Sequence, residues 1–137
     1  MPTMKIDGRC HCGYLTDEAE IDPDTVEICH CRDCQTLSGS AFSVVVPAVA
    51  GTFRQVSGEP ATYVKTAESG NKRIQAFCPR CGTRIYSAPA DGASSFFGLR
   101  VGSIVQRDQL VPKSQYWRRS AQGWVDDIGA LAKFDAE

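Results

Sequence analysis

The chain has 137 residues and a formal net charge of -1 at pH 7. A chain of this length is expected to form one domain, residues 1–137, with a core of its own. The near-neutral charge does not indicate a nucleic-acid-binding protein, and no apolar run approaches the ~20 residues of a membrane span, so neither partner is expected.

Short β-branched and aromatic stretches, separated by Gly and Pro, predict a mostly β domain with turns every ~8–12 residues. They cover residues 42–46, 52–56, 62–66, 73–77, 84–87 and 96–101. Between them and the N-terminus, residues 33–38 are predicted to form one helical turn that ends at Gly39 in a left-handed conformation. The mixed pattern of residues 116–134 predicts no element.

Seven cysteines form three tight clusters along the chain. They are Cys10 and Cys12, then Cys29, Cys31 and Cys34, then Cys78 and Cys81. An odd number disfavours complete disulfide pairing, and a disulfide within a C-x-C pair would close a strained ring. The N-terminus has no apolar signal region, so a reducing, cytoplasmic location is expected. Clustered cysteines in that setting indicate metal ligands.

The thiols favour zinc over hard cations, with an iron–sulfur cluster as a minor alternative. Structural zinc sites have four protein ligands, whereas catalytic sites commonly have three and an open position. The cysteines therefore divide into Cys10, Cys12, Cys78 and Cys81 for a structural zinc and Cys29, Cys31 and Cys34 for a catalytic zinc. Pairing the central cluster with Cys78 and Cys81 is the alternative, but it leaves Cys10 and Cys12 without partners.

Local geometry is predicted for each motif. Cys10 and Cys12 are expected to lie on an extended strand, which places their sulfurs on one face, and the same is expected for Cys29 and Cys31. His11 and His30, between these pairs, would then face away from the metal. In the third motif, Pro79 and Gly82 favour a knuckle in which backbone amides face the thiolates.

An open three-thiolate site could bind the thiol of a substrate and favour its ionised form, which is the nucleophile. The alternative from spacing alone is that water, His30 or a nearby carboxylate closes the site.

The three motifs and their surroundings resemble the glutathione-dependent formaldehyde-activating enzyme family, also called the centromere-protein-V domain. The matching segments are Gly8 to Gly13, Cys29 to Ser40, Gly58 to Pro60 and Phe77 to Thr83, within residues 8–124. The resemblance implies a β-tent, Mss4-like fold with two zinc ions divided four plus three. It also implies a carbon–sulfur lyase activity that joins formaldehyde and glutathione as S-hydroxymethylglutathione.

A carbon–sulfur lyase acting on a small aldehyde and a thiol such as glutathione is the leading functional prediction. A non-catalytic, zinc-stabilised binding module of the same fold is the alternative. Further candidates are arginines for a ligand carboxylate and aromatic residues for a pocket wall. They are Arg32, Arg80 and Arg84, and Tyr116, Trp117 and Trp124.

Overall fold

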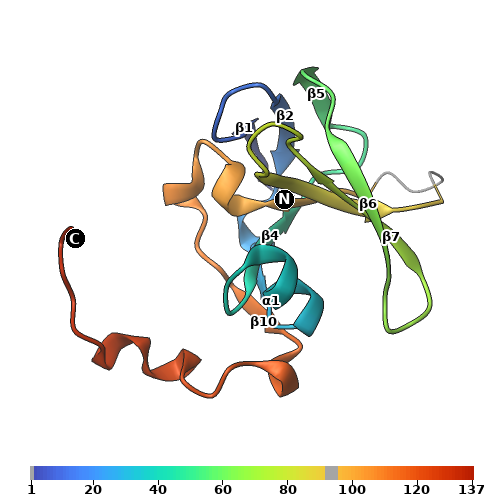
Figure 1. The fold of residues 1–137 in the computed structure, drawn as a ribbon. Coiled ribbons are helices and arrows are strands. Elements are labelled where there is room, and N and C mark those ends of the chain that lie inside the picture. Colours follow the sequence, from blue (N-terminus) through green and yellow to red (C-terminus); the bar gives the residue numbers. More distant parts are fainter. Residues whose placement is uncertain (1, 92–95) are drawn as a thin grey trace.

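The computed structural model describes residues 2–91 and 96–137. Its strands form two sheets (Figure 1). The smaller sheet has the order β1-β2-β5 and is antiparallel. It consists of β1 (Met4–Arg9), β2 (Thr16–Ile21) and β5 (Arg54–Ser57).

The larger sheet has seven strands in the order β10-β3-β4-β9-β8-β7-β6. All neighbours are antiparallel except β10, which runs parallel to β3. The strands are β3 (Glu27–Cys29), β4 (Ser43–Pro47), β6 (Ala61–Thr66), β7 (Lys72–Phe77), β8 (Arg84–Pro89), β9 (Gly98–Arg100) and β10 (Ser114–Tyr116).

The apolar core joins residues of both sheets with the segment that follows β9. Ile6, Ile21, Val46, Leu99 and Ile104 are all at most 2 % exposed. Two isolated bridges, Gly8 with Ile104 and Ile21 with Ala48, hold the small sheet to the rest of the molecule. The core therefore fixes the position of the loop that follows β1.

Helix α1 (Arg32–Ser38) follows β3 directly, and its first turn begins at Cys31, whose sulfur accepts the Cys34 backbone N–H at 3.3 Å. It ends at Gly39, which has φ 66°. A residue with a side chain is strained in that left-handed region, so Gly39 suits the helix end. The predicted helical turn and its glycine cap are confirmed.

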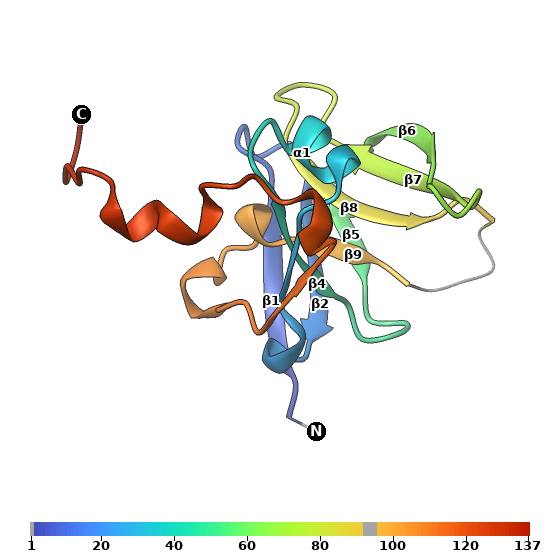
Figure 2. The same ribbon diagram turned by 90° about the horizontal axis from the view of Figure 1, so that it is seen from below.

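Short 3-10 turns complete the chain: η1 (Pro23–Thr25), η2 (Val101–Ser103), η3 (Arg107–Gln109), η4 (Arg118–Ser120) and η5 (Val125–Ala130). The last of them belongs to a C-terminal segment that extends away from the sheets (Figure 2). None of the described helices is long and apolar enough to cross a membrane.

The prediction of a mostly β fold is confirmed, and each predicted strand region contains an observed strand. Sequence analysis missed β1, β2 and β10. The extended strand expected at Cys29 and Cys31 is only partly right, because β3 ends at Cys29 and Cys31 caps α1. Residues 116–134, for which no element was predicted, include the end of β10 and two 3-10 turns.

Candidate functional site

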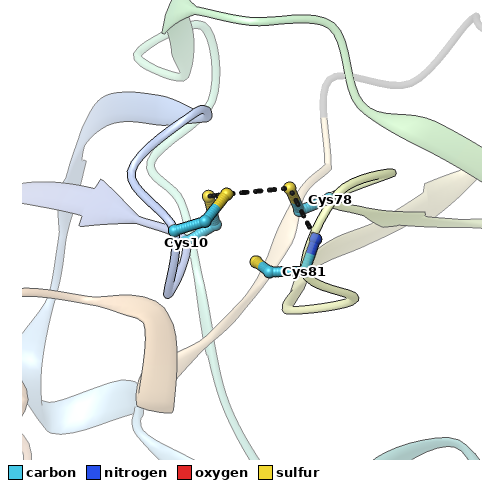
Figure 3. Close-up of side chains that lie close together, drawn as sticks. Cys10, Cys78 and Cys81 are labelled. Carbon is cyan, nitrogen blue, oxygen red and sulfur yellow. Dashed lines mark hydrogen bonds between the residues drawn. The ribbon is translucent and has the colours of Figure 1, made fainter.

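Four thiols from two segments that are far apart along the chain lie close together. Cys10 and Cys12 lie in the loop after β1, while Cys78 and Cys81 lie between β7 and β8 (Figure 3). Their sulfurs all lie within 4.8 Å of one another. The Cys10–Cys12 and Cys12–Cys78 sulfur distances are 3.6 and 3.8 Å. Tetrahedral zinc with ~2.3 Å bonds needs sulfurs about 3.8 Å apart, so this cluster fits zinc.

Backbone amides around this cluster point at its sulfurs. Cys78 accepts N–H groups from Arg80 and Cys81 at 3.4 and 3.5 Å, and Cys10 accepts the Leu15 N–H at 3.2 Å. Gly82 has φ 80° and donates its N–H to the Cys78 carbonyl, which closes the knuckle. Such donors stabilise a thiolate. The predicted knuckle is confirmed.

The strand expected at Cys10 and Cys12 is wrong. β1 ends at Arg9, and the chain then turns, with the Gly13 N–H donating to the Cys10 carbonyl at 3.1 Å. This turn, and not the alternation of side chains along a strand, brings the two sulfurs together. The chain turns here because it must reverse direction into β2, which pairs with β1 from Arg9 opposite Thr16 onward.

A second cluster comes from one short stretch at the end of β3 and the start of α1. The sulfurs of Cys29, Cys31 and Cys34 lie within 4.8 Å of one another. The hydrogen bond with Cys29 and the positive charge of Arg100 lower the pKa of Cys34 to about 5, although burial opposes them. Cys29, which shares that hydrogen bond, has a raised pKa. The donor set and spacing suit a soft metal ion.

The second cluster opens into a cavity of about 790 Å³, whereas no cysteine of the first cluster lines it. One face of the large sheet forms the floor. Residues directly opposite on paired strands share a face, so the register places Glu27, Val45 and Arg100 in one row. A neighbouring row consists of Gly98, Ser87 and Gln75. Every residue of both rows lines the cavity.

Guanidinium groups crowd one end of this floor. Arg84 and Arg100 both donate to the Gln75 side-chain oxygen, the latter at 3.2 Å. Burial lowers the pKa of Arg84 to about 10. Burial also lowers the pKa of Arg100, although the negative charge of Cys34 partly opposes this shift. The buried Arg100 Nε has no hydrogen-bond partner among the described residues.

The rim of the cavity carries two ion pairs. Lys65 on β6 binds Asp33 on α1 at 2.8 Å, and Arg119 binds Glu68 at 3.4 Å. The first pair links α1 to the far edge of the sheet. Because each pair has at least one well-exposed partner, we expect both pairs to contribute little to the stability of the fold.

The C-terminal segment supplies the remaining wall. β10 pairs with β3, so the chain leaves the sheet beside Cys29, and Trp117, Arg119 and Ser120 line the cavity. Gln35 on α1 holds this segment: its amide donates to the Ser120 carbonyl at 2.9 Å and its oxygen accepts from Gln122 at 2.8 Å. Trp117 has φ 59°, a strained conformation for a residue with a side chain.

The two histidines lie outside both clusters. His11 is exposed, and its backbone N–H donates to Thr83. His30 is fully buried, with its Nε2 2.8 Å from the Gln115 side-chain oxygen and its ring against Phe42. The metal-capable groups among the described residues contain cysteines alone.

Only two of the six arginines and aromatic residues that the sequence suggested as candidates line the cavity. Arg32 and Trp117 line the cavity. Arg80 stacks on Tyr14 at 3.9 Å, and Arg84 does not line the cavity but donates to the side-chain oxygen of Gln75, which does. Tyr116 and Trp124 are exposed and do not line the cavity.

Sequence analysis missed several lining residues, above all Glu27, Arg73, Gln75, Ser87 and Arg100. A signal for some of them was present. Arg73 and Gln75 are two residues apart on one predicted strand and so share a face, and Arg100 falls on another predicted strand. Polar side chains on the same face of a sheet could have indicated a polar cavity there.

Comparisons with known proteins place the chain in a family. Residues 5–120 match the model of the family described as glutathione-dependent formaldehyde-activating enzyme, which confirms the resemblance seen in the sequence. A Schizosaccharomyces pombe protein named as an uncharacterized lyase is 30 % identical over 92 residues. That match covers 66 % of this chain and 63 % of the relative, so the chain spans somewhat less than two thirds of the relative's length.

The crystal structure of a Rhodobacter sphaeroides protein superposes with a TM-score of 0.60 at 20 % identity. It covers 82 % of this chain and 99 % of that protein. At this identity the likeness concerns the fold alone, and it agrees with the predicted β-tent fold.

Proposed function

Because the chain belongs to the glutathione-dependent formaldehyde-activating enzyme family, we propose that it is a zinc-dependent carbon–sulfur lyase. It would add a thiol such as glutathione to a small aldehyde, or cleave the adduct. Cys29, Cys31 and Cys34 would hold the catalytic zinc, and Cys10, Cys12, Cys78 and Cys81 the structural one.

The reaction requires a thiolate and a place for one proton. The sulfur attacks the carbonyl carbon, a carbon–sulfur bond forms, the C=O π bond breaks, and the proton lost by the thiol ends on the new hydroxyl oxygen. Zinc bound by three cysteines would favour the ionised form of a substrate thiol and polarise the carbonyl. The cavity floor and the C-terminal wall would hold the two substrates beside that position.

One observation carries the proposal: the three-cysteine cluster opens to a large cavity, while the four-cysteine cluster contributes nothing to its lining. A metal with three protein ligands at the cavity wall keeps a position for substrate. The four-cysteine cluster offers the four ligands that a structural zinc needs, so it suits a structural role.

Cobalt substitution tests the proposal. In protein loaded with two cobalt ions, glutathione should change the thiolate-to-cobalt absorption, and Cys31→Ser should remove that change. Adduct formation from a panel of thiols and aldehydes should require the same cluster. A spectrum that stays constant at millimolar glutathione, with no adduct from any pair, would favour the non-catalytic binding module instead.

A further inference from the structure

More cationic than acidic side chains line the cavity. Its lining holds five cationic side chains, Lys65, Arg32, Arg73, Arg100 and Arg119, and three acidic ones, Glu27, Asp33 and Glu68. Two of the acids are already paired, with Lys65 and Arg119 at the rim. Among the residues that the structure describes, Arg73 and Arg100 have no ion-pair partner.

The cysteine cluster does not cancel this excess. Three thiolates with one divalent zinc carry a charge of about -1. With the three acids and the cluster counted together, the five cations leave an excess of about one positive charge in the lining. Arg73 and Arg100 are half-buried, where an unpaired charge is less well solvated than at the surface, so a ligand anion would stabilise this part of the floor.

The geometry around Arg73 and Arg100 is that of a small anion subsite. Arg73 lies over the Phe96 ring at 5.5 Å, and its Nη2 is 3.4 Å from the Ser87 hydroxyl. Arg100 extends from β9, on the other side of β8, and leaves its buried Nε without a partner among the described residues. Guanidinium donors arranged in this way match the two oxygens of a carboxylate.

Gly98 keeps this part of the floor hollow. A Cβ built there would lie 3.2 Å from the Ser87 Oγ and 3.2 Å from a Val45 methyl group. Gly98 pairs directly with Ser87 and lies two residues before Arg100 on the same face. Any larger residue would therefore reduce the space between the hydroxyl and the two arginines.

We propose that Arg73, Arg100 and Ser87 bind the carboxylate of the carbonyl substrate, which is then an aldehyde with an acid group next to its carbonyl carbon. This inference rests on the proposed function for the reaction itself. Arg100 lines the same cavity as Cys29, Cys31 and Cys34, and its positive charge acts on Cys34, so a carboxylate bound to Arg100 would lie near the reacting centre. A short acid such as glyoxylate suits that arrangement. The same arginines could receive a carboxylate of glutathione, and the experiment separates the two sources.

The test compares glyoxylate with glycolaldehyde, an aldehyde with the same two carbon atoms and no charge. With zinc-loaded protein and the neutral thiol 2-mercaptoethanol, the ratio of their kcat/KM values should favour glyoxylate. Arg73→Gln should lower this ratio about tenfold, the value of one charge-assisted hydrogen bond. Gly98→Ala should lower it too, without any change of charge. Arg54→Gln, at an exposed arginine paired with Glu18 on the small sheet, removes the same charge and should leave the ratio unchanged.

Acetate binding supplies a readout besides turnover. When zinc-loaded protein is titrated, the NMR signal of the Trp117 indole should shift to saturation with acetate and not with acetamide. Arg73→Gln should lower the affinity for acetate about tenfold. Equal ratios and equal acetate affinities in Arg73→Gln, Gly98→Ala and Arg54→Gln would overturn the inference.

Two other outcomes are equally informative. Arg73→Gln could lower kcat/KM for glutathione relative to 2-mercaptoethanol and leave the glyoxylate-to-glycolaldehyde ratio unchanged. In that case the arginines bind the thiol substrate and the inference is wrong. If glutathione never changes the cobalt spectrum while acetate still binds through Arg73, the proposed lyase function fails and the anion subsite remains.

Discussion

The two cysteine clusters have the same chemistry but different positions in the fold. The four-cysteine cluster joins the loop after β1 to the knuckle between β7 and β8, about half the chain apart, and Cys10 and Cys78 are buried beside Leu15 and Ile85. The three-cysteine cluster lies within six consecutive residues and faces the cavity. A metal site that closes a long loop is expected to stabilise the fold. A site whose ligands are close together in the sequence contributes less to folding and can serve catalysis.

The largest expected effect comes from Cys78→Ser. This change removes a buried ligand from the cluster that joins both sheets, and structural zinc can contribute on the order of 10 kcal/mol to small domains. We expect loss of soluble, cooperatively folding protein, measured by thermal unfolding and zinc analysis. A mutant that melts near the wild-type temperature would show that the two clusters do not differ in the way proposed.

Cys31→Ser should separate metal binding from folding. Its cluster closes only a short loop, so we expect a folded domain that has lost one of two zinc ions and all lyase activity. Circular dichroism, zinc stoichiometry and adduct assays on one preparation measure this. Unfolding as severe as that of Cys78→Ser would contradict the division of roles.

Asp17→Asn should stabilise the small sheet that carries the four-cysteine loop. Burial, together with the charge of Asp7, raises the pKa of Asp17 to about 6, from the usual 3.8. The folded state therefore keeps a proton that the unfolded chain loses between about pH 4 and 6, so the free energy of unfolding falls as pH rises through that window. At pH 7 the amide should add about 1 to 3 kcal/mol.

The control for this prediction is the pH dependence. Wild type and Asp17→Asn should converge in melting temperature near pH 4, and Glu18→Gln, at an exposed neighbour, should show no such convergence. A constant difference at all pH values would mean that the carboxyl does not titrate as described.

The smallest effect is expected for Gln35→Ala, which releases the C-terminal wall from α1. Loss of its hydrogen bonds to the Ser120 carbonyl and Gln122 should cost about 1 kcal/mol and raise KM for the thiol several-fold, with little change in zinc content. Thr36→Ala, at an exposed position of the same helix, is the matched control. A KM equal to that of the control would mean that the wall plays no part in substrate binding.

Local patterns predicted much of the fold. Gly39 marked the end of α1, and β-branched residues marked β4 to β9. β2 was missed because its buried face consists of Asp17, Ala19 and Ile21, which do not alternate clearly with the polar residues between them. β3 and β10 have three residues each, too few for a periodic pattern, and they exist because they pair with neighbours.

The sequence by itself determined which sulfurs could act together within each motif, because two or three cysteines a few residues apart lie close in most backbone conformations. Only the tertiary structure brought Cys10 and Cys12 to Cys78 and Cys81, since sheet pairing and the shared core hold these distant turns together. The same holds for the cavity. Arg73 and Arg100 are separated along the chain and share one face only because β7, β8 and β9 pair in register.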